Sequence, residues 1–337
     1  MNFKRWIALV VAAIVIVVSI GFQAVSSLAS ANWSEFAGGG SQTGGMEGIE
    51  EEELQPGDGS GSTIAVLDLQ GVIQDTGEGS LFDAGGYNHQ EFLYMLEQAG
   101  SSNDVDGIIL KVNTPGGGVV ESAEIHDAIV NVQEEYDKPV YITMGSQAAS
   151  GGYYIAAPAD KIVAHPATIT GSIGVIMQSI NYSELADNIG IEENSITSGE
   201  FKDIMSPGTE MSEEDEAILQ SIVDDMYDDF VQVIADGRGI AEEEVREIGD
   251  GRIYTGDQAQ EIDLVDDLGT MDDTVAFMEE EQDLEGARVV QYGASFSFNS
   301  FIGAGARSLF VRDAELLGIK ELLTTSNSPR AMYLYTD

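Results

Sequence analysis

The sequence predicts an α/β fold with a largely parallel sheet, and three observations support this prediction. From Thr63 onward, short apolar runs rich in Val and Ile alternate with longer segments that have helical spacing. Such an alternation of strands and helices is typical of α/β proteins. Glycine-containing turns join several predicted strands to the helices that follow them. The chain of 337 residues is long enough for one large core or for two domains.

The predicted elements follow one another in a regular order. Apolar runs bounded by turn residues predict strands at 63–73, 105–113, 138–144 and 160–166. Apolar residues at helical spacing predict helices at 89–100, 120–136 and 212–239. The last of these helices opens with a capping-box pattern formed by Ser212 and Asp215. From Tyr292 to the end, the sequence shows no clear period.

The N-terminus predicts a membrane anchor. Lys4 and Arg5 precede an uncharged apolar run from Trp6 to about Val25, which is long enough to span a bilayer as a helix. The basic residues favour a cytoplasmic N-terminus and place the rest of the chain outside the cell membrane. A cleaved signal peptide is the alternative, because small residues at 29–31 form an acceptable cleavage site. The length of the apolar run favours the retained single-pass anchor.

These patterns divide the chain into four segments. We expect an anchor at 1–34, a flexible, acidic, glycine-rich linker at 35–62, a folded domain at 63–283, and an accessory or mobile tail at 284–337.

Acidic residues dominate the composition. The 59 Asp and Glu residues outnumber the 14 Lys and Arg residues, which gives a formal net charge of -45. This charge argues against nucleic acid or an anionic lipid as the main partner. The ligand spacing of a calcium loop is absent. We interpret the charge as a solvated surface suited to high salt, as in a halophile such as a haloarchaeon.

Cysteine and histidine usage narrows the chemistry. The sequence contains no cysteine, which excludes disulfides, thiolate catalysis and zinc–thiolate sites. The three histidines, His89, His126 and His165, are far apart and do not form an H-E-x-x-H motif. The sequence therefore gives no reason to expect a metal or another cofactor.

Ser150 is the first candidate functional residue. It stands in "AASGG" (148–152), between a predicted strand and apolar residues suited to a helix. A serine there is usually an N-cap, and the local sequence alone favours that role. The alternative is a nucleophile beside backbone N–H groups that could hold an oxyanion.

Two further glycine turns make the alternative more specific. One is "PGGG" (115–118), which joins a predicted strand to a helix, and the other lies within "TITGSIGVI" (168–176). Each turn is a weak signal alone. Their order is far more specific: a strand, a P-G-G-G turn and a helix are followed by a strand, an A-S-G-G turn and a helix.

This order of motifs resembles the signal peptide peptidase A family, which comprises membrane-bound serine–lysine peptidases of the ClpP/crotonase-like superfamily. The matching stretches are "NTPGGGVVESAEI" (113–125), "ASGGYYIAAPADKIVAHPATITGSIGV" (149–175), "SGEFKDIMSP" (198–207) and "GRIYTGDQAQEIDLVDDLG" (251–269). The resemblance implies a spiral of ββα units that assembles into a homo-oligomeric ring with inward-facing active sites. It also implies peptide substrates, such as cleaved signal peptides and other short apolar peptides, and no cofactor.

The resemblance also implies roles for five residues. Ser150 would be the nucleophile and Lys202 the general base, with Ser172 hydrogen-bonded to the lysine amine. The backbone N–H groups of Gly117 and Gly151 would form the oxyanion hole. A lysine can act as a base only when its amine is neutral, and burial lowers its pKa, so we expect Lys202 to be largely dehydrated. Without the resemblance, Lys202 would be interpreted as a surface charge paired with a neighbouring carboxylate.

Three other functions are alternatives to that of a serine–lysine peptidase. A Ser–His–Asp hydrolase of the G-x-S-x-G type needs a histidine well downstream of its serine, and none follows His165. A crotonase-like enzyme that binds an acyl-CoA thioester would not need Ser150 or Lys202. A membrane-tethered, inactive scaffold would be expected to have lost one of these two residues. Peptide hydrolysis through an acyl-enzyme accounts for both.

Overall fold

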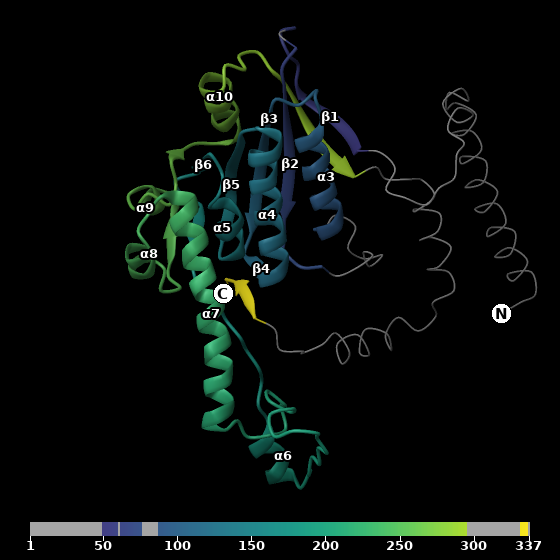
Figure 1. Cartoon of the computed structure of the whole chain (residues 1–337), viewed down its shortest axis with the longest axis vertical. Helices are drawn as coiled ribbons and strands as arrows, with labels where there is room; N and C mark the ends of the chain where they lie inside the picture. Colours follow the sequence, from purple (N-terminus) through teal and green to yellow (C-terminus); the bar gives the residue numbers. More distant parts are fainter. Residues whose placement is uncertain (1–48, 60, 76–86, 295–330, 336–337) are drawn as a thin grey trace, which may run out of the picture. The chain divides into compact units, whose positions relative to one another are not determined.

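The computed structural model describes residues 49–59, 61–75, 87–294 and 331–335 (Figure 1). Its strands are β1 (Ile49–Gln55), β2 (Thr63–Gln70), β3 (Gly107–Thr114), β4 (Gly116–Gly118), β5 (Val140–Ala149), β6 (Lys161–Ala164), β7 (Ile169–Gly171), β8 (Ile253–Thr255), β9 (Asp267–Leu268), β10 (Arg288–Ala294) and β11 (Met332–Leu334). Its helices are α3 (His89–Ser101), α4 (Val119–Tyr136), α5 (Gly151–Ala156), α6 (Ser183–Ile189), α7 (Glu213–Arg238), α8 (Glu242–Ile248), α9 (Gly256–Gln260) and α10 (Met271–Glu281).

The main sheet runs in the order β1-β10-β2-β3-β5-β6-β9. Its strands from β10 to β9 are parallel, and β1 pairs antiparallel with β10 at one edge. The C-terminal end of β5 pairs instead with β7, which in turn pairs with β8. A separate two-stranded sheet joins β4 to β11. The predicted α/β class with a largely parallel sheet is thus confirmed.

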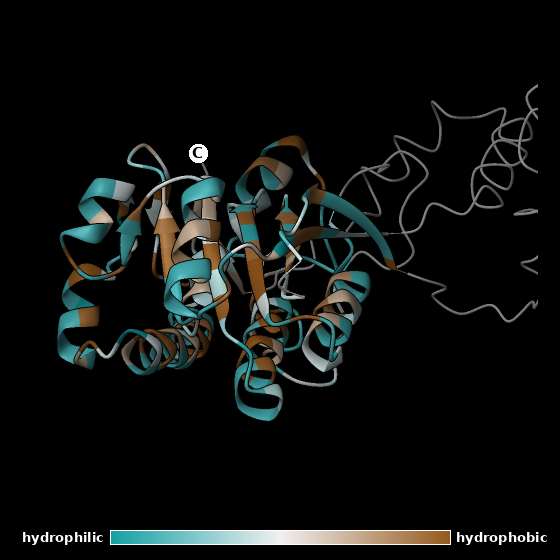
Figure 2. Ribbon diagram, turned by 90° about the horizontal axis from the view of Figure 1, so that it is seen from above, coloured by the Kyte–Doolittle hydropathy of each residue, from teal (hydrophilic) through white to brown (hydrophobic). Residues whose placement is uncertain are grey.

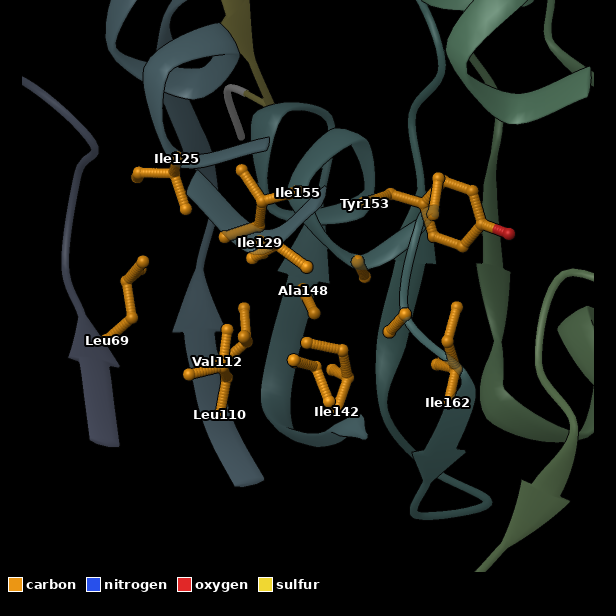
Figure 3. Close-up of a cluster of buried hydrophobic side chains, with 14 of the residues drawn as sticks. Leu69, Leu110, Val112, Ile125, Ile129, Ile142, Ala148, Tyr153, Ile155 and Ile162 are labelled. Atoms are coloured by element: carbon orange, nitrogen blue, oxygen red, sulfur yellow. The ribbon is translucent and has the colours of Figure 1, made fainter. Parts of the chain in front are cut away.

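Helices cover both faces of the sheet. Successive side chains of each strand point to opposite faces, and both sets include apolar residues that pack against helices. On one face, Leu69, Leu110 and Ile142 pack against α4 and α5, as Figure 3 shows. On the other face, Ile109 and Tyr141 pack against α10. Hydrophobic segments gather where strands and helices meet, and many outward turns of the helices are hydrophilic (Figure 2). Helix α5, which follows Ser150, is fully buried and contacts β5, α4 and α7.

The helix predicted at 212–239 is confirmed as α7, including its capping box. The Ser212 hydroxyl accepts a hydrogen bond from the Asp215 backbone N–H, and the Asp215 carboxylate accepts one from the Ser212 N–H. Only the C-terminal half of this helix is buried, where Gly237 contacts the backbone at Ala157 too closely for a side chain. This contact fixes α7 against the end of α5.

The N-terminal half of α7 carries a protruding arm, residues 176–211, which includes α6. Helix α6 lies beside that end of α7, away from the sheet (Figure 1). The arm folds back on itself, because the Tyr182 N–H donates to the Pro207 carbonyl at 2.8 Å and the Asn181 amide donates to the Thr209 carbonyl at 2.7 Å. Most of its residues are exposed.

Two predicted boundaries are corrected by the structure. The prediction of a flexible linker at 35–62 is wrong for 49–55, which form the edge strand β1. The prediction of an accessory or mobile tail at 284–337 is wrong for 288–294, which form β10 inside the main sheet. Strand β1 is stabilised by backbone pairing and has few apolar residues to reveal it, while β10 is too short to show a period.

The predicted membrane anchor and the first part of the predicted linker lie outside the described residues. Within the described ranges, the helices are too short or too polar for any of them to traverse a bilayer.

Candidate active site

Ser150 lies between the end of β5 and the start of α5 in an unusual backbone conformation. Its φ of 55° and ψ of -116° are rarely adopted by a residue with a side chain. Only 1% of its surface is exposed, and its side chain makes no capping hydrogen bond to α5. Ser150 therefore occupies the N-cap position without performing the usual N-cap role, which leaves its hydroxyl available for chemistry.

The strained backbone predicts an unusual order of stability among variants of Ser150. Glycine adopts positive φ without the steric cost that a Cβ carries. We expect Ser150→Gly to be about 1 kcal/mol more stable than Ser150→Ala, measured by thermal unfolding. The same pair of substitutions at Ser221, on the exposed side of α7, should give the opposite order, because glycine destabilises a helix. If the Ala variant were more stable than the Gly variant at both sites, backbone strain at Ser150 would be contradicted.

The predicted oxyanion-hole glycines come together around Ser150. Strand β4 approaches the start of α5 so closely that a Cβ on Gly116 would lie 2.6 Å from the Gly151 nitrogen. A Cβ on Gly151 would lie 3.1 Å from the Gly117 nitrogen. Thr114 supports this turn, because its Oγ1 accepts a hydrogen bond from the Gly116 N–H at 3.0 Å. The backbone of the P-G-G-G turn and that of the A-S-G-G turn thus meet, and no side chain separates them.

An extended segment of the chain's own C-terminus lies on this turn. Strand β11 pairs antiparallel with β4, with Tyr333 opposite Gly117. On its other side it forms a bridge to Ile176, whose N–H donates to the Met332 carbonyl at 3.0 Å. The Tyr333 carbonyl oxygen would be 3.1 Å from a Cβ on Gly151, so it faces the predicted oxyanion-hole donors. This is the arrangement expected of a bound peptide.

The Tyr333 side chain fills an aromatic pocket. Its ring stacks on Tyr154 of α5, with ring centroids 5.0 Å apart, and contacts Phe230 of α7 at 4.6 Å. Its hydroxyl donates to the Met226 carbonyl at 3.0 Å. Burial raises the pKa of Tyr333, and it raises the pKa of Tyr154 to about 12, so both phenols stay neutral at ordinary pH. The pocket thus suits a large, uncharged side chain.

Ser172 lies next to Ser150 in space. The Ser150 N–H donates to the Gly171 carbonyl at 2.8 Å, which holds the serine turn against the end of β7. Ser172 follows Gly171, is largely buried, and also has a positive φ, of 51°. It borders a cavity of about 490 Å³ that Leu334 of β11 also lines. The structure therefore brings four of the five predicted site residues together.

Lys202 is the predicted site residue that the single chain does not bring to the others. It lies in a turn of the arm, where its backbone N–H donates to the Gly199 carbonyl at 3.3 Å. Its side chain is exposed, so the expected dehydration is not met within one chain. The reason is physical: the arm protrudes from α7, and too little of this chain surrounds the turn to exclude water.

Lys111 and the three histidines, which also carry basic side chains, have other partners. The Lys111 ammonium lies 3.4 Å from the Asp68 carboxylate. His89 bonds to Tyr87 and Glu124, each at 2.6 Å, while His126 pairs with its neighbour Asp127. His165 accepts a hydrogen bond from a nearby backbone N–H. Within the described part of the chain, none of these histidines is hydrogen-bonded to Ser150, as a Ser–His–Asp hydrolase would require.

The sequence analysis missed the strand β11 and its aromatic pocket. The short run "AMYLY" (331–335) is apolar and could have been predicted as extended, but nothing in it indicates where it docks. Tyr153 and Tyr154 lie in the matching stretch 149–175, but the sequence predicts no role for either of them. Tyr153 is structural, because its hydroxyl donates to the Leu264 carbonyl at 2.8 Å.

A strained, buried serine at a helix start of an α/β sheet, beside glycine N–H groups, is the arrangement expected of a serine hydrolase. Comparison with known proteins makes the class more specific. The family model described as "Peptidase family S49" matches residues 133–285. A protein of Enterococcus faecium named "Putative signal peptide peptidase SppA" is 39% identical over an alignment that covers 99% of each chain.

More distant relatives agree with this match. A protein of Methanocaldococcus jannaschii named "Putative protease MJ0651" is 33% identical over 64% of this chain and 70% of its own length. Protease 4 of Salmonella typhi is 35% identical over 64% of this chain, which spans only 34% of that longer protein. The chain belongs to peptidase family S49 and is a serine-type endopeptidase. The resemblance that the motifs predicted is thus confirmed.

Proposed function

We propose that this endopeptidase hydrolyses short, apolar, extended peptides, among them cleaved signal peptides. Ser150 attacks the scissile carbonyl while Lys202, as a neutral amine, takes the proton of the Ser150 hydroxyl. The N–H groups of Gly117 and Gly151 stabilise the oxyanion, at roughly 3 kcal/mol per donor. The protonated lysine then donates its proton to the leaving amine. A water molecule repeats the sequence to release the acid, and Ser172 orients the lysine amine.

The pose of β11 is the observation that carries this proposal. An extended segment adds to β4 by strand pairing, a mode of recognition that uses the peptide backbone and leaves side chains to fill pockets. Its Tyr333 carbonyl faces the turn that holds Gly117 and Gly151. A substrate bound in the same way would present a carbonyl to Ser150 and a large apolar side chain to the pocket of Tyr154 and Phe230. The Enterococcus faecium relative, which is named as a putative signal peptide peptidase, supports the choice of substrate.

The position of Lys202 leads to a site shared between two copies of the chain. The 26 residues of α7 span about 39 Å, and the arm lies at the end of α7 away from α5. In our proposal, the arm of a neighbouring copy inserts Lys202 beside Ser150. Contact with that copy removes water from the lysine, and a dehydrated site favours the neutral amine over the charged one. Head-to-tail contacts of this kind form a ring when the rotation between copies brings the last copy back to the first.

Exposed apolar side chains on and beside the arm support such a contact. Large apolar residues that stay exposed together on one surface usually mark an interaction site. The exposed large apolar residues of the arm and of the first half of α7 include Ile180, Leu185, Ile189, Ile191, Ile196, Phe201, Met211, Ile218 and Ile222. A neighbouring copy that covers them would bury both the apolar surface and Lys202.

The remaining features of the proposal follow the resemblance. The fold is of the ClpP/crotonase-like spiral type, and the ring encloses the active sites in an inner cavity. The apolar run near the N-terminus anchors the chain in the cell membrane, with residues up to 34 as the anchor and the peptidase domain outside. The parallel sheet, β4 and the serine turn are consistent with that fold.

The test is hydrolysis of a fluorogenic apolar peptide by the full chain in detergent and multimolar salt. We expect Ser150→Ala and Lys202→Ala to lose activity at least about a thousandfold while remaining folded. Lys111→Ala, which also removes one lysine charge, is the matched control and should stay active. If Lys202→Ala stays active and Lys111→Ala does not, the base is misassigned. An inert wild-type assembly would contradict the proposed class of short apolar peptide substrates.

A further inference from the structure

Strand β5, which leads to Ser150, contains a bulge just before the serine. Val112 of β3 pairs with Met144, and the next pair is Thr114 with Ala148. Residues 145–147 of β5 therefore lie opposite Asn113 alone. Bulges bend a strand and are common beside active sites, where they redirect a side chain.

The bulge marks the point at which β5 changes partner. Residues 141–144, which precede the bulge, pair with β6, whereas residues 147–149, which begin at its last residue, pair with β7. This change carries the chain out of the main run of strands and toward Gly171, whose carbonyl accepts a hydrogen bond from the Ser150 N–H. The shape of the bulge thus decides where Ser150 lies relative to the P-G-G-G turn.

Two polar side chains hold the bulge by bonding to backbone groups within it. Asn113 Oδ1 accepts a hydrogen bond from the Gln147 N–H at 3.1 Å. Thr168 Oγ1 donates to the Gly145 carbonyl at 2.7 Å, and only 1% of Thr168 is exposed. The Asn113 side chain also packs against Gly145 so closely that a Cβ there would lie 3.0 Å from the Asn113 Cβ. The bulge is therefore fixed from both neighbouring segments.

We propose that Asn113 and Thr168 are positioning residues for the nucleophile. They bond backbone groups in the bulge and thereby keep Ser150 at the distance from Gly117 and Gly151 that peptide hydrolysis needs. This inference rests on the proposed role of Ser150. Without these side chains, backbone groups in a half-buried bulge lose their partners, and the strand relaxes toward a regular register. Even a shift of about 1 Å at a reacting group can lower a rate on the order of a hundredfold.

The deciding variants are Thr168→Val, which keeps the shape of threonine but removes the hydroxyl, and Thr168→Ser, which keeps the hydroxyl. Thr274→Val is the matched control. Thr274 is also fully buried and donates its hydroxyl to a backbone carbonyl, that of Thr270 at 2.9 Å, but it lies on α10 away from the serine turn. Asn113→Leu, which removes the acceptor, and Asn113→Asp, which retains it, form a second pair.

We expect kcat of Thr168→Val and Asn113→Leu to fall by about 10- to 100-fold, with KM changed by less than about threefold. The rate at which a fluorophosphonate labels the serine should fall in parallel. Thr168→Ser should recover most of kcat, and Thr274→Val should lose stability to a similar degree without losing kcat. A purely structural role would instead give equal losses of stability and unchanged kcat in both Val variants.

The outcomes separate this inference from the proposed function. If Ser150→Ala is inactive while Thr168→Val and Asn113→Leu keep full kcat, the positioning role is refuted and the nucleophile stands. If Ser150→Ala is itself active, the proposed function fails first, and the labelling rate will show no dependence on the bulge. If Thr168→Val or Asn113→Leu does not fold, Thr168→Ser and Asn113→Asp still decide the question. These two variants retain the hydrogen-bonding atom, so a loss of their kcat would contradict a positioning role for that atom.

Discussion

Coexpression of Ser150→Ala and Lys202→Ala chains is expected to restore activity that neither variant has alone. If each site takes its serine from one copy and its lysine from the next, one chain of the pair supplies an intact serine and the other an intact lysine. Random mixing in equal amounts gives both residues at about a quarter of the sites. We therefore expect about a quarter of the wild-type activity per chain, measured with the same fluorogenic peptide.

The control for this experiment is a chain that carries both substitutions. Coexpressed with either single variant, it leaves each shared site without its serine or its lysine, so activity should stay absent. A mixed assembly with no activity, although the two variants copurify, would show that serine and lysine must come from the same chain. That result would require the arm to fold back onto its own serine, contrary to the position of α6 beside the outer end of α7.

Removal of residues 331–337 is expected to raise kcat/KM by about tenfold or more, mainly through a lower KM. Strand β11 lies on β4 where a substrate strand would bind, and a tethered competitor acts at an effective concentration near the millimolar range. The measurement is a substrate titration of the full chain and of the chain shortened to residue 330. Substrate gains access to β4 and to the pocket of Tyr154 and Phe230 once the strand is gone.

A blocked peptide with the sequence of 331–335 provides the control. It should inhibit the shortened chain competitively, and a peptide in which the residue equivalent to Tyr333 is Asp should inhibit it far less, because the pocket would have to bury a carboxylate. If shortening lowers activity and thermal stability together, and the peptide restores both, β11 is a structural strand rather than a competitor.

The parts of the fold that were predicted from the sequence are those with a long or chemically distinctive local signal. The amphipathic helix at 212–239 and its capping box match α7 because periodicity and capping chemistry both act within a few residues. The turns that hold Gly117, Ser150 and Gly151 were also predicted, since long motifs resembling a known family fix their order in the chain. The approach of these turns to one another depends on the pairing of β3 with β5, which the resemblance to a known family implies but the motifs do not show directly.

The features that were not predicted depend on partners distant in the chain. Strand β1 has a run of glutamates that reads as a solvated linker, and only its pairing with β10 makes it a strand. The surroundings of Lys202 depend on what packs around the arm, which local sequence does not encode. The role of Asn113 follows from a register shift between β3 and β5, and a register shift has no one-dimensional pattern.

Strand β1 also bears on how the molecule avoids uncontrolled association. An unpaired sheet edge is a template on which another chain can add a strand, and natural proteins discourage such growth with charged side chains. Among the described residues, β1 is an edge strand of the main sheet, and its glutamates at 50–53 are all exposed. In multimolar salt their mutual repulsion reaches only about 3 Å, but a second strand would still have to strip water from opposing carboxylates. The hydration of these glutamates thus disfavours the addition of a strand from another chain, even at salt concentrations that screen the charge repulsion.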